Sequence, residues 1–332
     1  MHSQCDGCTF VKKIMKILFS YPSGSKLLTK IKIVFALLFL CNVSFAQDTS
    51  TKITKQLPLY KLTGFTQTYY YSPGHEERAK SIAVFMEKAG KYFQKELKFT
   101  PKATLYILAP QHWKDVAAKP LQDVYGFPHN IDTSRLAIAA EDNDFWRSFL
   151  PEVAKLSPPM AAQVAKAYRK PDGFYSMMPF FDLLALHEMG HSYTSQAGLK
   201  MQRHWMGELF VNIMLHTYVA EKQHELLPAL ETFPDMVVSA GTAEYKFTSL
   251  EDFEKLYETL GMGPKNYGWY QSKLHSAAKD IYKAGGKTVL NKLWKSLKRH
   301  QEEMTDIEFA NMLNKEVHPS VANVYVKWNQ LN

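Results

Sequence analysis

The stretch LALHEMGHSYT, residues 184–194, holds the pattern that decides how this chain is organised. His187 and His191 lie four residues apart, so on an α-helix both imidazoles leave the same face, with their Cβ atoms about 5–6 Å apart. Two histidines at this spacing can bind one metal ion. Glu188 lies next to the first histidine, where a carboxylate can take a proton from water at the ion. The stretch predicts a helix that carries a metal site, and the simpler alternative is three polar residues that share a helix.

The flanking residues place this pattern in the middle of one helix. Pro179 is followed by the apolar run FFDLLAL, and proline is favoured in the first helical turn. Gly198 follows the pattern, and glycine is common just after a helix ends. We therefore predict a helix over residues 180–197.

A catalytic zinc ion takes three protein ligands and keeps one position open, so a third ligand is needed. Glu208, in HWMGELFVNIMLHTYV, is the strongest candidate, because the sixteen residues that separate it from His191 allow one helix to end and a second to return. Asn212 lies one turn further along and could accept the ring N–H of a histidine. His204 is an alternative ligand. Glu208 could also be an acid that the helix dipole favours near the helix start.

Two segments, HEMGH at residues 187–191 and WMGELF at residues 205–210, resemble the gluzincin clan of zinc metallopeptidases, and within it the membrane-alanyl-aminopeptidase family. Order and approximate spacing match, although Gly207 replaces an asparagine and the gap is slightly shorter. The resemblance covers roughly residues 100–330 and lacks the large N-terminal β-sandwich of that family. It implies a thermolysin-like catalytic domain, Glu188 as general base, and one Zn²⁺ ion held by His187, His191 and Glu208.

The same resemblance implies two further site residues. The family's transition-state tyrosine corresponds to Tyr270, 62 residues after Glu208 and expected at the head of a helix, with Tyr267 as second choice. Its hydroxyl would donate a hydrogen bond to the oxyanion. The glutamate that holds a substrate amine corresponds to Glu141 in AAEDN, residues 139–143, on an expected edge strand that could align a peptide. A solvated strand end is the alternative interpretation of Glu141.

Residues 1–46 predict a signal peptide. Six lysines and one acidic residue are followed by the apolar run IVFALLFLC and by NVSFA, which places cleavage before Gln47. The run is well short of the ~20 apolar residues that span a bilayer. We therefore expect export to the periplasm or the extracellular space, without stable membrane insertion after cleavage.

Removal of this leader changes what the composition implies. The formal net charge falls from +8 to +3, which leaves little support for a nucleic-acid partner. All three cysteines lie in the leader, so the mature chain is not a disulfide scaffold. With 46% hydrophobic residues, the chain can bury a sizeable core.

The order of the β-rich and helical segments predicts an α+β fold. A small N-terminal mixed sheet with helices is followed by a mainly α-helical half, and the zinc site lies on the helix at their junction. Residues 47–71 form an N-terminal extension in this interpretation. The metallopeptidase domain covers residues 72–332, with its α/β half at 72–180 and its helical half at 181–332.

Individual elements follow from periodicity and capping residues. Ser72 is the expected N-cap of a long helix over residues 72–97, and β-rich runs at 103–110 and 134–142 predict strands. Tyr69, Tyr70 and Tyr71 fit a strand or a packing segment. Further helices are predicted over residues 160–168, 180–197, 206–222, 249–260, 268–284, 287–300, 305–315 and 320–330.

The favoured function is that of an exported, zinc-dependent peptidase acting on a peptide or protein substrate. The alternative is a non-catalytic secreted binding protein that retains a metallopeptidase fold. The residues alone leave open whether such an enzyme would cut at chain ends or within chains, and what its oligomeric state is.

Overall fold

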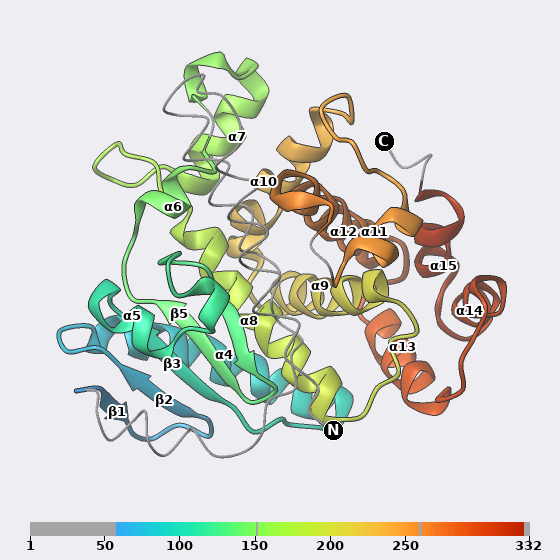
Figure 1. Cartoon of the computed structure of the whole chain (residues 1–332), viewed down its shortest axis with the longest axis horizontal. Coiled ribbons are helices and arrows are strands. Elements are labelled where there is room, and N and C mark those ends of the chain that lie inside the picture. The colour runs from blue at the N-terminus through green and yellow to red at the C-terminus, as the bar shows by residue number, and fades with distance from the viewer. Residues whose placement is uncertain (1–57, 151, 259–260, 329–332) are drawn as a thin grey trace, which may run out of the picture.

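The computed structural model describes residues 58–150, 152–258 and 261–328 (Figure 1). In this part of the chain the fold is α+β, as predicted, with one small mixed sheet and many helices. The predicted signal peptide, its cleavage site and the three cysteines lie outside the described residues. Among the helices that the structure describes, none combines the length and apolar character needed to cross a membrane.

The five strands of the sheet lie in the order β1-β2-β3-β5-β4. The three central strands are parallel to one another, and the two edge strands are antiparallel to their neighbours. The strands predicted over 103–110 and 134–142 are confirmed as β3 and β5. The strand bounds are β1 (Tyr60–Leu62), β2 (Thr68–Tyr71), β3 (Thr104–Leu108), β4 (His129–Asp132) and β5 (Arg135–Ala139).

The sheet begins before residue 72, so the predicted boundary between an extension and the domain is wrong. β1 and β2 lie within the range 47–71, yet β2 pairs in parallel with β3 at the centre of the sheet. Tyr69, at the middle of β2, is fully buried. The described part of the extension is therefore part of the α/β half.

Edge strand β4 was not predicted from the sequence. Its residues His129, Asn130 and Asp132 have low strand propensity, so the segment has no β-rich pattern. It pairs with β5 with a register irregularity between Asn130 and Asp132. Pairing with β5, and not local preference, makes this segment a strand.

The first long helix, α4 (Glu76–Leu97), begins four residues later than predicted. Ser72 is not its N-cap, because the Ser72 hydroxyl is buried and accepts a hydrogen bond from the Ala109 amide at 2.8 Å. Gly74 has a φ of +84°, which turns the chain between Ser72 and the helix. The apolar face of α4 packs against β1 and β2.

The remaining helices make up most of the described chain. The eleven α-helices that follow α4 are α5 (Pro110–Val116), α6 (Asp144–Arg147), α7 (Pro158–Tyr168), α8 (Met178–Gln196), α9 (His204–Lys222), α10 (Leu227–Ser239), α11 (Leu250–Leu256), α12 (Gly263–Gly285), α13 (Thr288–Arg299), α14 (Asp306–Met312) and α15 (Pro319–Val326). A π-helix, η4 (Leu313–Val317), joins α14 to α15, and the short 3₁₀ helices are η1 (Lys119–Leu121), η2 (Val153–Lys155) and η3 (His224–Leu226).

Two helices in the second half differ clearly from their predictions. α12 begins at Gly263 and not at 268, because Gly263 adopts a φ of +72° and a proline follows in the first helical turn. α10 was missed, since Pro228 and Pro234 argue against a helix, yet Pro234 lies within it. The helix predicted over 249–260 is α11, which begins after the N-cap Ser249 and ends at Leu256.

Helix α8, which carries the HEMGH pattern, lies between the sheet and α9 (Figure 1). It contacts β4 and β5 on one side and α9 on the other. Arg78 of α4 forms an ion pair with Asp182 of α8, which fixes α8 to the α/β half. α9 is buried on nearly all sides from Trp205 to Ala220, as expected for a helix with few polar residues in its middle turns.

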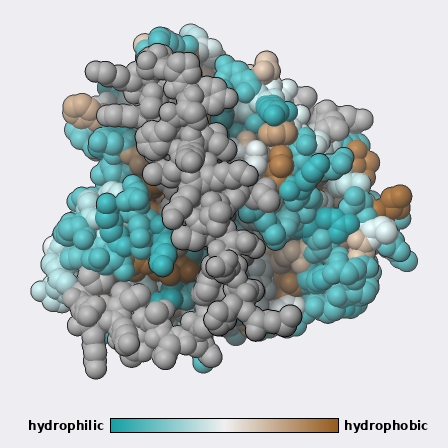
Figure 2. All heavy atoms as spheres, in the orientation of Figure 1, coloured by the Kyte–Doolittle hydropathy of each residue, from teal (hydrophilic) through white to brown (hydrophobic). Residues whose placement is uncertain are grey.

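The described surface shows no concentration of large apolar side chains. The exposed large hydrophobic residues lie on separate elements, as Tyr60, Phe174 and Ile307 do, and isolated exposed apolar residues are normal. Figure 2 shows mostly hydrophilic described residues on the face it presents, with small hydrophobic areas between them.

Candidate metal centre

Two neighbouring helices, α8 and α9, bring the predicted metal ligands together. His187 and His191 come from α8, and Glu208 comes from the second turn of α9. The helices approach closely at Gly190, where an added Cβ would lie 2.8 Å from the Val211 side chain. A residue with a side chain at position 190 would hold the helices apart, so this glycine is needed for the histidines to meet Glu208.

The three side chains converge on a single point. The Nε2 atoms of His187 and His191 lie 3.3 Å and 3.8 Å from Oε2 of Glu208. One potential ligand atom from each residue lies within 4.8 Å of the other two. The structure therefore forms a possible metal-binding triad from the three residues that the sequence singled out.

The surroundings of the triad fit a metal cation. Glu208 is 3% exposed, and its buried Oε2 has no hydrogen-bond partner, although a buried carboxylate oxygen normally has one. His187 is also buried, while the side chain of His191 is 30% exposed and leaves the centre open on one side. Two imidazoles and one carboxylate with an open side are the ligand set of catalytic zinc sites.

The electrostatics of the triad favour positive charge. Burial alone would raise the pKa of Glu208, but His191 and His187 lower it well below its usual value. Burial also opposes protonation of His187, yet Glu208 and Glu188 together raise its pKa. Burial lowers the pKa of His191 to about 4, which keeps this imidazole neutral. The negative potential that raises the pKa of His187 would equally favour a divalent cation.

Asn212 lies where the sequence placed it, beside the first histidine. Nδ1 of His187 donates to Oδ1 of Asn212 at 2.8 Å, and Asn212 is fully buried. This bond places the ring proton on Nδ1 and leaves the Nε2 lone pair directed at Glu208. Such support from behind a histidine fixes the tautomer that binds metal.

Glu188 is held beside the triad by a residue that the sequence did not indicate. Nδ2 of Asn130, on β4, donates to the Glu188 carboxylate Oε2 and to its backbone carbonyl, both at 2.8 Å. Burial raises the pKa of Glu188 to about 7. A carboxylate with such a pKa can both take and release a proton near neutral pH.

Tyr270 lies in different surroundings from those its expected role requires. It lies in the third turn of α12 and not at the head of that helix, and its side chain is fully buried. Its hydroxyl donates to the Ser249 carbonyl at 2.7 Å, and its ring packs on Phe253 and Trp328. The hydroxyl of Tyr267, the second choice, accepts a hydrogen bond from Gln271.

A different tyrosine reaches the triad. The hydroxyl of Tyr257, which follows α11, donates to Oε1 of Glu208 at 2.6 Å. No sequence pattern marks Tyr257, because the contact joins residues that are 49 positions apart.

Glu141 does not lie on an edge strand. It follows β5, which has a neighbour on both sides, and the edge of the sheet is β4. The residue is exposed, and its backbone amide donates to the hydroxyl of Tyr125 at 3.3 Å. The expectation that this strand is an edge is wrong, and the strand that borders α8 with a free edge among the described residues is β4.

Two further histidines lie close to the triad without belonging to it. His204 stacks on Tyr257 with ring centroids 4.5 Å apart, and its Nε2 lies 3.6 Å from Oε1 of Glu258. His275 of α12 is buried and stacks on His187 with centroids 5.9 Å apart. Burial lowers the pKa of His275 to about 3, so this ring is neutral and supports His187 by packing.

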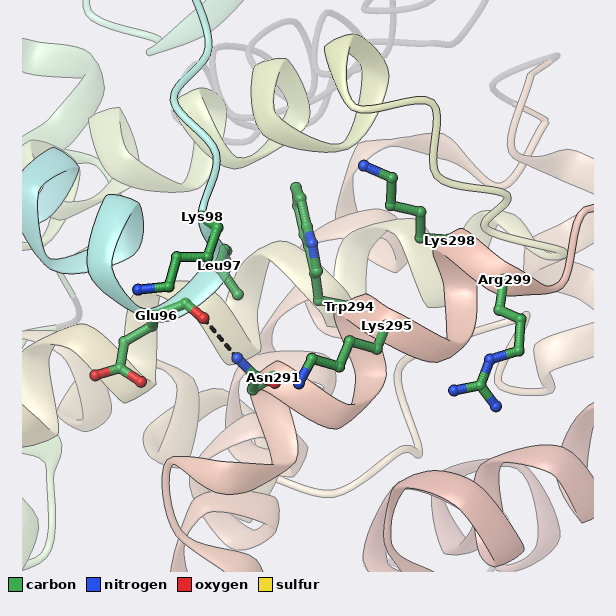
Figure 3. A pocket seen from close by; sticks show the side chains of 8 residues that line it. All are labelled: Glu96, Leu97, Lys98, Asn291, Trp294, Lys295, Lys298 and Arg299. Atoms are coloured by element: carbon green, nitrogen blue, oxygen red, sulfur yellow. Dashed lines mark hydrogen bonds between the residues drawn. The ribbon is translucent and has the colours of Figure 1, made fainter.

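A separate pocket of about 510 Å³ lies between the end of α4 and α13 (Figure 3). Asn291 of α13 donates to the Glu96 carbonyl and joins the two helices there. Lys98, Lys298 and Arg299 lie at the C-terminal ends of these helices, where the helix dipole favours cations. This basic character is explained by the helix ends, and none of the triad residues lines the pocket.

No family model, curated protein or solved structure matches this chain. The function is therefore inferred from the arrangement of its own residues.

Two carboxylates with different surroundings flank the paired histidines. Glu208 faces both rings, whereas Glu188 accepts a hydrogen bond from Asn130 of strand β4.

Proposed function

We propose that this protein is an exported, zinc-dependent peptidase of gluzincin type with a thermolysin-like catalytic domain. The observation that carries the proposal is that two buried carboxylates, Glu208 and Glu188, have different hydrogen-bond partners and neighbours. Oε2 of Glu208 faces the Nε2 atoms of His187 and His191, whereas Glu188 bonds to Asn130 and has a pKa near neutrality. A metal-ligand set beside a general base is the composition that metal-dependent hydrolysis of a peptide bond uses.

Zinc held by this ligand set would acidify water and polarise a scissile carbonyl. Glu188 would take the proton of the attacking water and pass it to the leaving amine. Asn130, by donating to Oε2 of Glu188, holds that carboxylate in place for the transfer. β4, which carries Asn130, is an edge strand of the described sheet and offers backbone groups along which an extended peptide could pair.

A non-catalytic secreted binding protein is the second candidate. The position of Tyr270 favours it, because the hydroxyl expected to stabilise an oxyanion is buried and bonded to the Ser249 carbonyl. Such a protein would keep the metal triad as a structural centre. Export of either protein is part of the proposal, and N-terminal sequencing of the exported chain should find Gln47 first.

Metal content and peptide hydrolysis of the mature protein and of Glu188→Gln decide between these candidates. We expect about one zinc per chain in both proteins, because Glu188 is not a ligand, and a kcat about 10²–10⁴-fold lower in the variant. Glu152→Gln, the same change at an exposed position, is the control and should keep full activity.

Three results would contradict the peptidase proposal. Zinc binding without cleavage of any member of a broad peptide library would favour the binding protein. Equal activity in Glu188→Gln would remove the general base. Unaltered activity and no zinc in His187→Ala would remove the metal from the mechanism.

A further inference from the structure

The two carboxylate oxygens of Glu208 have different surroundings. Oε2 lies 3.3 Å and 3.8 Å from the two histidine Nε2 atoms, whereas Oε1 accepts the Tyr257 hydroxyl at 2.6 Å. A glutamate carboxylate rotates about its last torsion with little preference, so either oxygen could face the histidines. A donor on one oxygen selects the other for the metal.

Tyr257 is itself fixed by its neighbours. Its ring stacks on His204 with centroids 4.5 Å apart and an interplanar angle of 17°, and it packs on Phe253 of α11. Glu254 of α11 accepts hydrogen bonds from the amides of His204 and Trp205, the first residues of α9. The N-cap residue of α9 makes no side-chain hydrogen bond of its own, so Glu254 of α11 caps the start of α9 instead. Tyr257, which follows α11, reaches Glu208 in the second turn of α9.

We infer that Tyr257 is a positioning residue that turns Glu208 toward the metal before the metal binds. A hydrogen bond to a carboxylate is charge-assisted and short, as this one is. Loss of such a partner behind a ligand typically weakens metal binding by about 10–100-fold. The inference rests on the metal site of the proposed function and does not require peptide cleavage.

A tyrosine hydroxyl at this place has one other conceivable role, donation to the oxyanion of a substrate. The two roles differ in what they change. Positioning of Glu208 affects the affinity of the protein for zinc, with or without substrate. Donation to an oxyanion affects kcat and leaves zinc affinity unchanged.

The test compares zinc dissociation constants of the wild type, Tyr257→Phe and Tyr282→Phe, measured by competition with a chromogenic chelator. Tyr282→Phe is a matched control, because the Tyr282 hydroxyl donates to Oε1 of Glu221 at 2.7 Å near the other end of α9. Phenylalanine keeps each ring and its packing. We expect zinc binding about 10–100-fold weaker in Tyr257→Phe and within about twofold of wild type in Tyr282→Phe.

Unchanged zinc affinity in Tyr257→Phe overturns the inference, as does an equal loss in both variants. A lower kcat with unchanged zinc affinity in Tyr257→Phe also overturns it, in favour of the oxyanion role. These outcomes are separate from the failure of the peptidase proposal. A wild type that binds zinc and cleaves no peptide refutes the peptidase, while the comparison of affinities still decides the role of Tyr257.

Discussion

The stability of edge strand β4 should depend on pH through one buried side chain, His129. It is fully buried, its Nδ1 donates to the Phe127 carbonyl, and its Nε2 accepts from the Ala118 amide. Both nitrogens are used in the neutral form, and burial lowers the pKa to about 4. The next residue is Asn130, which donates a hydrogen bond to Glu188. Protonation of His129 would remove the acceptor of the Ala118 amide and destabilise the strand that carries Asn130.

The unfolding free energy should therefore fall as the pH drops from about 6.5 to about 4. In this window unfolded chains bind a proton at His129 and folded chains do not, so acid favours unfolding by up to about 3 kcal/mol. His129→Gln offers one acceptor and one donor without titrating, and its unfolding free energy should depend less on pH. Urea unfolding at a series of pH values measures both proteins, and identical pH dependence would refute the assignment.

At the scale of elements, the sequence predicts the features that depend on neighbouring residues and misses those that depend on residues far apart in the chain. The motif helix, with Pro179 in its first turn, and the candidate ligand Glu208 were predictable, because periodicity, capping and spacing are local signals. Strand β4 was not, because its pairing with β5 overrides weak propensity. Asn130 and Tyr257 lie 58 and 49 residues from the carboxylates they contact, so no local pattern reports them.

The contact between α8 and α9 yields a prediction for Gly190→Ala. An added Cβ would lie 2.8 Å from the Val211 side chain, and overpacking of this kind costs about 1–3 kcal/mol. The better helix propensity of alanine offsets about 1 kcal/mol of this cost, so we expect a lower melting temperature. Zinc binding should also be weaker, because the added Cβ would separate the two helices that carry the ligands. Gly207→Ala is the control, because its Cβ would meet only Met201 at 3.9 Å. Thermal unfolding should show this control as stable as wild type or more so.

At the scale of the whole molecule, the triad joins the two halves of the fold. α8 packs on β4 and β5 and bonds to α4, whereas α9 packs on α12, α11 and α13. A cation bound by ligands from both helices therefore ties the α/β half to the helical half. Binding confined to the folded state adds stability, about 4 kcal/mol at a concentration 1,000 times the dissociation constant.

Removal of zinc should accordingly lower the melting temperature of the entire chain in one transition. Calorimetry of the mature protein before and after chelation, and after return of zinc, measures this shift. His191→Ala is the control: it lacks one ligand, and its melting temperature should not respond to zinc. A shift in the wild type alone would show that the junction of the two halves is held by the metal. Equal melting temperatures with and without zinc would instead mean that helix packing alone, through contacts such as Gly190 on Val211, holds the ligands in place.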